Sequence, residues 1–272
     1  MSLSIPTIVD TIALPTGVRL PYVEQGDRAG VPVLLLHGYS DSWRSYEHVL
    51  PHLPGDLRAI AVTHRGHGDA DRPASGYAPD DFAADVVALL DALAIERAVI
   101  VGHSMSAWIA ERVAACHSDR VLGVVLAGAI GPARHNAAVA KLVAAVDELR
   151  DPVDREFAYE FQLSTLARPL PDGQLDTFIA ESLKLPARVW RAIKDGWPSF
   201  DVQRELAAIE APALVVWGDR DTVGTRAEQD AIVRALERGR LLVYEGTGHA
   251  LFWEQPARFA ADVTAFAREV AG

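Results

Sequence analysis

A strand that turns directly into a helix is the feature that most constrains this chain. Residues 98–101 form a short, continuous apolar run, which is typical of a buried parallel strand. The chain then turns through Ser104 and continues with the apolar spacing of a helix. A strand that gives way to a helix within two or three residues strains the backbone at the bend and exposes the side chain there. We therefore predict that Ser104 stands at this bend with its hydroxyl accessible.

The residues on either side of Ser104 fit such a turn. The strand and helix backbones nearly touch there, and Gly102 has no side chain to obstruct them. Position 106 is usually glycine in turns of this kind, but here it is serine. Since serine is among the smallest substitutes, we expect the turn to form. The Gly-x-Ser-x-Ser pattern alone is weak evidence, because Ser104 could simply cap a helix, and the flanking strand and helix strengthen it.

The composition limits the class of protein. A chain of 272 residues, half of them hydrophobic, predicts one large domain or one domain with an inserted subdomain. The net charge of −11 argues against a nucleic-acid-binding surface, and a single cysteine allows no disulfide within the chain. With neither a signal-peptide pattern nor a membrane-spanning apolar run, we expect a cytoplasmic protein with a small-molecule substrate. The oligomeric state, monomer or homodimer, stays open.

Apolar runs and helical patterns alternate along most of the chain. The predicted strands are an N-terminal hairpin at 4–14 and 18–24, followed by 31–36, 59–62, 98–101, 121–126, 213–217 and 241–244. Helical patterns occupy 79–93, the stretch after Ser104, 226–238 and the region from 256. This alternation predicts an α/β fold with a mostly parallel sheet of about eight strands, covered by helices on both faces.

The alternation stops between residues 131 and 208. This segment has several helical patterns, no convincing strand and many aromatic residues. It leaves and rejoins the sheet at the end where the loops after parallel strands lie. We therefore predict a helical lid at 131–208 on a core made of 1–130 and 209–272.

Three kinds of reactive side chain follow the ends of separate predicted strands: Ser104, the acidic pair Asp219 and Asp221, and His249. Loops at the carboxyl ends of parallel strands converge on one edge of the sheet. Histidine can take the proton of an attacking serine, and a carboxylate can orient the histidine. The charge that develops on the attacked carbonyl oxygen needs donors, for which we expect the backbone amides of Tyr39 and Met105 to serve as an oxyanion hole.

With these motifs, the chain resembles the α/β-hydrolase superfamily, particularly lid-bearing esterase and epoxide-hydrolase-like members. The resemblance covers nearly the whole chain outside the lid. It rests on five ordered motifs, His37-Gly38-Tyr39, His64-Arg65-Gly66-His67-Gly68, Gly102-His103-Ser104-Met105-Ser106, Gly218-Asp219-Arg220-Asp221, and Gly248-His249 followed by Glu254 and Pro256. By this resemblance the catalytic acid is Asp221 rather than Asp219. Epoxide hydrolases and haloalkane dehalogenases place aspartate at the bend, so Ser104 argues against both activities.

We therefore expect a serine hydrolase that needs no cofactor or metal and cleaves a carboxylic ester or lactone through an acyl-Ser104 intermediate. One alternative is cleavage of a carbon–carbon bond in a vinylogous diketone by the same residues. Another is a small-ligand sensor, because Gly-His-Ser-x-Ser-Ala looks like the same segment of the karrikin and strigolactone receptors. We expect four aromatic residues to line the substrate pocket, namely Trp43, Trp190, Trp197 and Phe252.

Overall fold

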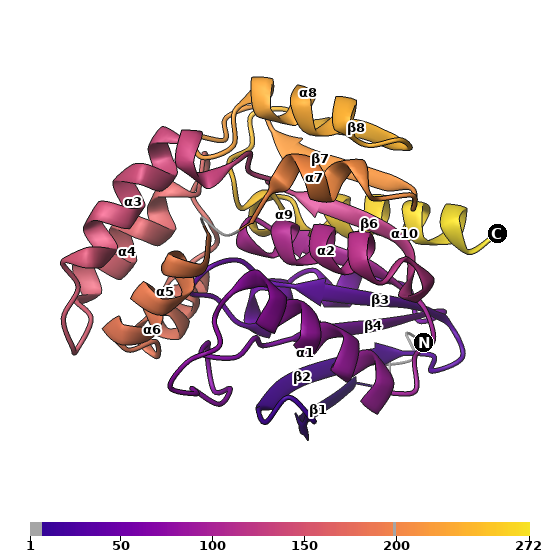
Figure 1. The fold of residues 1–272 in the computed structure, drawn as a ribbon, viewed down its shortest axis with the longest axis horizontal. Helices are drawn as coiled ribbons and strands as arrows, with labels where there is room; N and C mark the ends of the chain where they lie inside the picture. Colours follow the sequence, from indigo (N-terminus) through magenta and orange to yellow (C-terminus); the bar gives the residue numbers. More distant parts are fainter. Residues whose placement is uncertain (1–6, 198–199) are drawn as a thin grey trace.

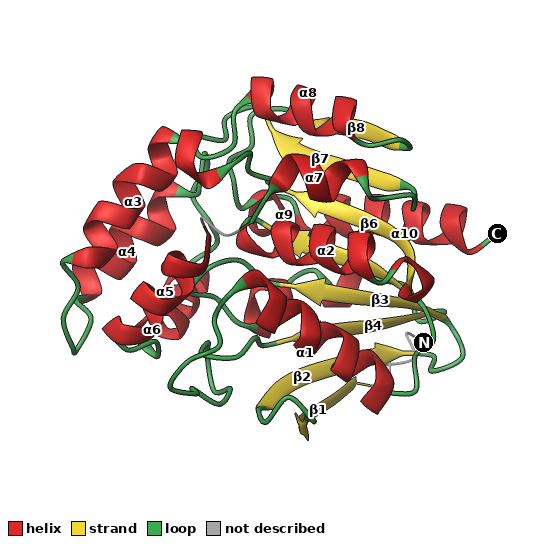
Figure 2. Ribbon diagram, in the orientation of Figure 1, coloured by secondary structure: helices red, strands yellow, loops and turns green. Residues whose placement is uncertain are grey.

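An eight-stranded sheet runs through the molecule in the computed structural model, which describes residues 7–197 and 200–272 (Figures 1 and 2). The strand order is β1-β2-β4-β3-β5-β6-β7-β8. β2 pairs antiparallel with β1 and with β4, and all other neighbours are parallel. The strands are β1 (Thr7–Ala13), β2 (Arg19–Gly26), β3 (Val31–Leu36), β4 (Leu57–Val62), β5 (Ala98–His103), β6 (Val121–Ala127), β7 (Ala213–Gly218) and β8 (Gly239–Tyr244). The predicted α/β fold is thus confirmed; residues 4–6 of the predicted hairpin lie outside the described residues.

Helices cover both faces of this sheet because its central strands are apolar on both sides. The α-helices that the structure describes outside the segment between β6 and β7 are α1 (Pro79–Ala92), α2 (Met105–Cys116), α8 (Arg226–Ala235), α9 (Leu251–Glu254) and α10 (Pro256–Ala271). In β3, Leu34 and Leu36 join one core cluster with α1 and α2, whereas Val33 and Leu35 join another with α9 and α10. No described helix combines the length and the apolar character needed to cross a lipid bilayer.

The strand order reverses beside β3. β4 pairs with one edge of β3 and β5 with the other, so the chain moves in opposite directions across the sheet from this point. Ligands of open α/β sheets bind outside the carboxyl ends of the strands at such a reversal. The turn after β3, which contains Tyr39, and the turn after β5, which contains Ser104, therefore meet at this edge.

The segment between β6 and β7 is helical in its described residues. It contains α3 (Ala137–Asp147), α4 (Arg155–Ser164), α5 (Gln174–Leu183), α6 (Ala187–Gly196) and α7 (Val202–Ala207). α3 to α6 lie together beyond the carboxyl ends of the strands, where α3 packs on α6 and α4 on α5 (Figure 1). α7, in contrast, packs against α2 and α8 beside the sheet. We call residues 131–208 the insertion.

Candidate active site

Ser104 occupies the bend between β5 and α2. Its backbone has φ 53° and ψ −117°, a strained conformation for any residue other than glycine. Its amide donates a hydrogen bond to the Ala127 carbonyl oxygen at 2.9 Å, which ties the bend to β6. A Cβ atom at Gly102 would lie 2.1 Å from the Ser106 carbonyl oxygen, so only glycine fits there. Ser104 is partly exposed although both neighbours are buried, as predicted for the residue at this bend.

His249 and Asp221 form a buried pair in the loops after β8 and β7. His249 Nδ1 donates to Asp221 Oδ2 at 2.8 Å, and both side chains are almost fully shielded from solvent. The other carboxylate oxygen accepts from the Val223 and Gly224 amides at 2.7 and 2.9 Å, which fixes the carboxylate. Because Nδ1 carries the proton, Nε2 is the imidazole atom that can accept another.

Asp219, the second carboxylate predicted near His249, has a different environment. It accepts a hydrogen bond from the Gly246 amide at 2.5 Å, and its side chain is 35% exposed. The structure therefore brings Asp221, and not Asp219, into contact with the imidazole.

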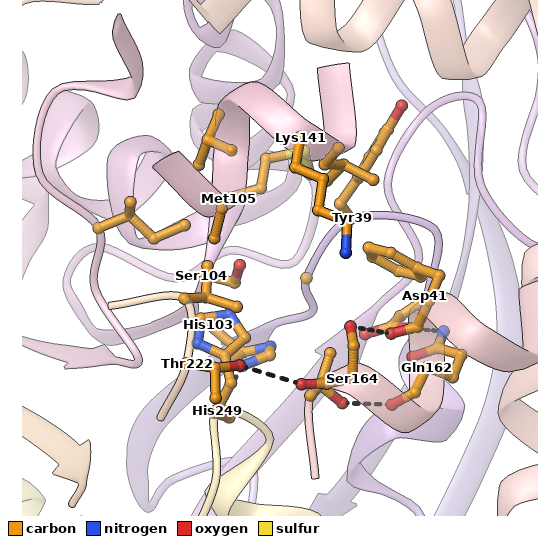
Figure 3. A pocket seen from close by; sticks show the side chains of 18 of the residues that line it. Tyr39, Asp41, His103, Ser104, Met105, Lys141, Gln162, Ser164, Thr222 and His249 are labelled. Atoms are coloured by element: carbon orange, nitrogen blue, oxygen red, sulfur yellow. Dashed lines mark hydrogen bonds between the residues drawn. The ribbon is translucent and has the colours of Figure 1, made fainter. Parts of the chain in front are cut away.

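Ser104 and His249 line one cavity of about 410 Å³ (Figure 3). Both residues are described, and no direct hydrogen bond joins them. Catalytic hydrogen bonds of this kind are often long before substrate binds. The cavity lies between the carboxyl edge of the sheet and the insertion, whose α3 and α4 supply much of its wall.

Tyr39 and Met105 also line this cavity. Met105 is the first residue of α2, so its amide has no acceptor within the helix. The hydroxyl of Tyr39 donates to the Trp190 carbonyl oxygen at 2.5 Å, and its ring packs edge-to-face on Trp190 and Trp197. The insertion thereby holds the turn that carries the Tyr39 amide.

A closed set of hydrogen bonds, which we call the elbow network, joins Ser106, His64 and His37. The Ser106 hydroxyl donates to the His37 carbonyl oxygen and accepts from His64 Nε2, the latter at 3.0 Å. The His64 amide donates to His37 Nε2 at 3.0 Å, and His37 Nδ1 donates to the Gly38 carbonyl oxygen at 2.7 Å. Burial lowers the pKa of both imidazoles well below the usual value, so both rings are neutral. The serine at position 106 therefore binds the Ser104 bend to the Tyr39 turn.

The His67 ring also packs against His37, which makes a cluster of three imidazoles. In the part of the chain that the structure describes, no group of three or more His, Cys, Asp or Glu side chains is arranged to hold a metal ion. Each of these rings makes hydrogen bonds to neighbouring protein groups, and the cluster is part of the packing below the Tyr39 turn.

A second buried set, the insertion network, joins Ser40 and Asp41 to Gln162 of α4 and Ser182 of α5. Gln162 Nε2 donates to Asp41 Oδ1 and to Ser182 Oγ, each at 2.8 Å, and the Ser40 and Ser182 hydroxyls lie 3.0 Å apart. Burial raises the pKa of Asp41 to about 7, although the Gln162 hydrogen bond opposes the shift. Sequence reasoning missed this set because Asp41 and Gln162 are 121 positions apart and no motif marks either residue.

Of the four aromatic residues predicted to line the pocket, Trp197 does so. The structure corrects the prediction for the other three, which lie outside the cavity lining. Trp190 is fully buried against Tyr39, and Phe252 is fully buried in the core cluster on the α10 face. Trp43 packs below the Arg44 guanidinium in a 3-10 turn. Apolar residues not foreseen supply the wall instead, including Trp108, Ile130, Val139, Leu142, Phe157 and Phe161.

The mostly parallel sheet carries a serine at a strained bend and a buried Asp–His pair at the same edge. This combination is typical of a class of hydrolases. Comparison with known proteins identifies the family. A profile of the Alpha/beta hydrolase family matches residues 33–262, and the chain therefore belongs to this family.

Individual relatives differ in the activities for which they are named. A non-heme chloroperoxidase of Streptomyces lividans is 29% identical over 290 residues, which cover 95% of this chain and 99% of that protein. A 2-hydroxymuconate semialdehyde hydrolase of Pseudomonas sp. (strain CF600) is 29% identical, covering 94% of this chain and 93% of that protein. The solved structure of the esterase RhEst1 from Rhodococcus sp. ECU1013 superposes with a TM-score of 0.83 at 29% identity, covering 96% of this chain and 99% of that one.

Proposed function

We propose that this protein is a serine hydrolase that cleaves a carboxylic ester or lactone through an acyl-Ser104 intermediate. The observation that carries the proposal is the hydrogen bond from His249 Nδ1 to a fixed Asp221 carboxylate, at the cavity that Ser104 also lines. This pair leaves His249 Nε2 as the base on the cavity side. An esterase fold neighbour such as RhEst1 adds support.

The reaction proceeds in two acyl transfers. Ser104 Oγ attacks the carbonyl carbon while its proton moves to His249 Nε2, and Asp221 stabilises the imidazolium. The Tyr39 and Met105 amides donate to the oxyanion. His249 then protonates the leaving alcohol as the carbon–oxygen bond breaks, which leaves the acyl group on Ser104. A water molecule then gives a proton to His249 as it attacks the acyl carbon, and His249 passes this proton to Ser104 Oγ as the acid leaves, which restores the Ser104 hydroxyl. Every step uses groups of this chain and water, so the reaction needs no cofactor or metal.

The cavity favours a small to medium substrate with an apolar part. A volume of about 410 Å³ is at the lower end of the range for small-molecule sites. Residues of α2 and of the insertion, among them Trp108 and Leu142, give it an apolar wall. The insertion covers this cavity, and we propose that it acts as the lid.

Carbon–carbon bond hydrolysis is a second candidate function. It is favoured by the similarity to the 2-hydroxymuconate semialdehyde hydrolase, which extends over 94% of this chain. The same serine, histidine and aspartate would then attack the keto carbonyl of a vinylogous diketone, and the leaving group would be a carbanion instead of an alkoxide.

One substrate panel tests these functions. p-Nitrophenyl esters of increasing acyl length, a lactone and a vinylogous diketone are assayed with wild type and with Ser104→Ala. We expect multiple turnover of the short esters by wild type and its loss in Ser104→Ala. Faster turnover of the diketone would favour the second candidate. Stoichiometric release followed by a stall would indicate a sensor, and undiminished activity of Ser104→Ala would contradict the mechanism.

A further inference from the structure

We propose that Asp41 and His103 form a polar subsite that binds a hydrogen-bond donor of the substrate, a hydroxyl or ammonium group on the acyl chain near the reacting carbonyl. This inference rests on the proposed ester hydrolysis and adds the chemical class of the acyl group. Such a subsite makes esters of hydroxy and amino acids better substrates than esters of alkanoic acids with the same shape.

His103 supplies an unpaired acceptor. It is the last residue of β5 and lines the cavity, yet its side chain is buried. Its Nε2 lies 3.2 Å from the His249 carbonyl oxygen, which can only accept, so Nε2 carries the proton. Burial lowers the pKa of this imidazole well below the usual value, and the ring is therefore neutral. Nδ1 thus presents a lone pair, and none of the described residues donates to it.

Asp41 supplies a second acceptor. Its side chain is buried, and within the described residues no Lys, Arg or His forms an ion pair with it. Gln162 Nε2 donates to Oδ1 from the insertion side. The other oxygen, Oδ2, faces Gly38. Each donor that bonds to a buried carboxylate without a cation stabilises its charge, and a substrate donor would add one at Oδ2.

The two acceptors border the same side of Gly38. A Cβ atom built on Gly38 would lie 2.7 Å from His103 Nδ1 and 3.3 Å from Asp41 Oδ2. Gly38 directly precedes Tyr39, whose amide we assign to the oxyanion hole. A donor held by these acceptors would therefore lie close to the carbonyl that Ser104 attacks. Figure 3 shows Asp41 and Gln162 across the cavity from Ser104.

The chemistry of these two atoms selects the ligand. Ether, ketone and halide groups carry no hydrogen for either acceptor, and an alkyl group would leave both unpaired. An ammonium group can donate to both and neutralise the carboxylate. A hydroxyl can donate to one acceptor, and it can also accept from Asp41 when that carboxyl is protonated. The shared requirement is an O–H or N–H donor.

Ionisation of Asp41 should strengthen the preference. Burial raises its pKa to about 7, so the fraction carrying full charge increases through neutral pH. The titratable groups that act on Asp41 from neighbouring elements are His249 and Glu181. Asp41 in turn raises the pKa of Tyr46, and the neutral His103 ring borders the same side of Gly38. Glu181 is itself balanced by Lys184 Nζ at 2.9 Å.

Three ethyl esters of equal shape test the subsite, with a methyl, a hydroxyl or an ammonium group on the β carbon: 3-methylbutanoate, 3-hydroxybutanoate and 3-aminobutanoate. The measured quantity is kcat/KM for each polar ester divided by kcat/KM for the methyl ester, for both enantiomers. Any pH dependence of the shared acyl-transfer steps affects all three esters equally and cancels in the ratio. We expect wild type to favour at least one donor ester by about 10- to 100-fold, the range for a hydrogen bond to a charged group. The ratio should increase with pH through the Asp41 pKa.

Asp41→Asn keeps an acceptor for Gln162 but removes the charge. We expect it to lower the ratio by about 10-fold for the ammonium ester and to make it independent of pH. The matched control is Glu156→Gln, which removes an exposed carboxylate of α4 that does not line the cavity and should keep the wild-type ratio.

The outcomes separate this inference from the proposed function. If wild type hydrolyses the methyl ester but its ratios stay near one at every pH, the subsite is overturned and ester hydrolysis stands. If none of the three esters is hydrolysed and Ser104→Ala behaves as wild type, the proposed function has failed. The wild-type pH profile decides the question even if Asp41→Asn does not fold. Equal ratios in folded Asp41→Asn and wild type would limit Asp41 to a structural contact with Gln162.

Discussion

The two walls of the cavity are built differently. The sheet side consists of Ser104, His249, Asp221 and the elbow network, from the loops that follow strands β3, β4, β5, β7 and β8 and from the first turn of α2. The insertion side consists of residues of α3 and α4, the insertion network and Trp197. On the sheet side, backbone amides or carbonyls bond to the Asp221 carboxylate, the Ser106 hydroxyl and the His37 ring. On the insertion side, one amide, that of Gln162, contacts both Asp41 and Ser182.

This difference assigns separate tasks to the two walls. Groups held by backbone hydrogen bonds from adjacent strands keep their geometry without substrate, as preorganised catalysis requires. Groups joined by side chains of packed helices determine the shape and polarity of the cavity. We therefore expect changes on the sheet side to lower kcat and changes on the insertion side to affect KM and substrate choice.

The largest effect is expected for Asp221→Asn. Loss of the carboxylate removes the group that holds the His249 tautomer and stabilises the imidazolium, which costs about 10⁴-fold in kcat. Asp219→Asn is the matched control, because Asp219 is partly exposed and bonds to the Gly246 amide instead. Steady-state kinetics with a short p-nitrophenyl ester measure kcat for both variants. A greater loss in Asp219→Asn would mean that the other carboxylate is the acid.

Ser106→Gly tests the elbow network on the same wall. Glycine suits the bend, but the His37 carbonyl and His64 Nε2–H lose their partner. Removal of a whole oxyanion donor costs ~10²–10³ in rate, and we expect about 10-fold in kcat for its displacement, with KM nearly unchanged. Ser75→Gly, at an exposed loop position, controls for the loss of a serine. If the midpoint of thermal unfolding falls but kcat does not, the network only stabilises the fold.

Gln162→Leu tests the insertion wall. The leucine removes the amide that donates to Asp41 and Ser182, so both lose a buried partner. We expect KM to rise by about 10-fold with a smaller change in kcat. Gln203→Leu, on the exposed face of α7, is the control. A fall in kcat with unchanged KM would contradict the division of tasks between the walls.

The smallest effect on activity is expected for Glu111→Gln, which lies in neither wall. Glu111 is fully buried in α2, no described residue pairs with its carboxyl oxygens, and burial raises its pKa. The unfolded chain ionises Glu111 above its ordinary pKa of 4.5 while the folded protein stays protonated, so stability falls as pH rises from there. Glu111→Gln should therefore raise the free energy of unfolding by about 1 kcal/mol near neutral pH, with kcat unchanged.

Chemical denaturation at two pH values measures this gain. It should disappear below the pKa of the unfolded Glu111 carboxyl, where both states are protonated. Glu210→Gln, at an exposed position, should change nothing. A gain of equal size at both pH values would mean that the raised pKa is not its cause.

The sheet side was predictable from the sequence and the insertion side was not. Apolar runs that end in a small residue fix the strand ends, and those ends place Ser104 and His249 at one edge. The spacing of the motifs alone does not show whether Asp219 or Asp221 is the catalytic acid. The choice of Asp221 rests on the family resemblance. No backbone hydrogen bonds between neighbouring strands fix how the helices of the insertion are placed relative to the sheet. The sequence therefore could not show that Trp190 packs against Tyr39 whereas Trp197 lines the cavity.

The most direct test of the central claim is to trap the covalent intermediate. Wild type and Ser104→Ala are each treated with a fluorophosphonate, and the modified residue is located by peptide mass spectrometry. We predict one adduct, on Ser104, that forms rapidly in wild type, slowly in Asp221→Asn and not at all in Ser104→Ala. An adduct on another residue, or equal labelling of Ser104→Ala, would contradict the account.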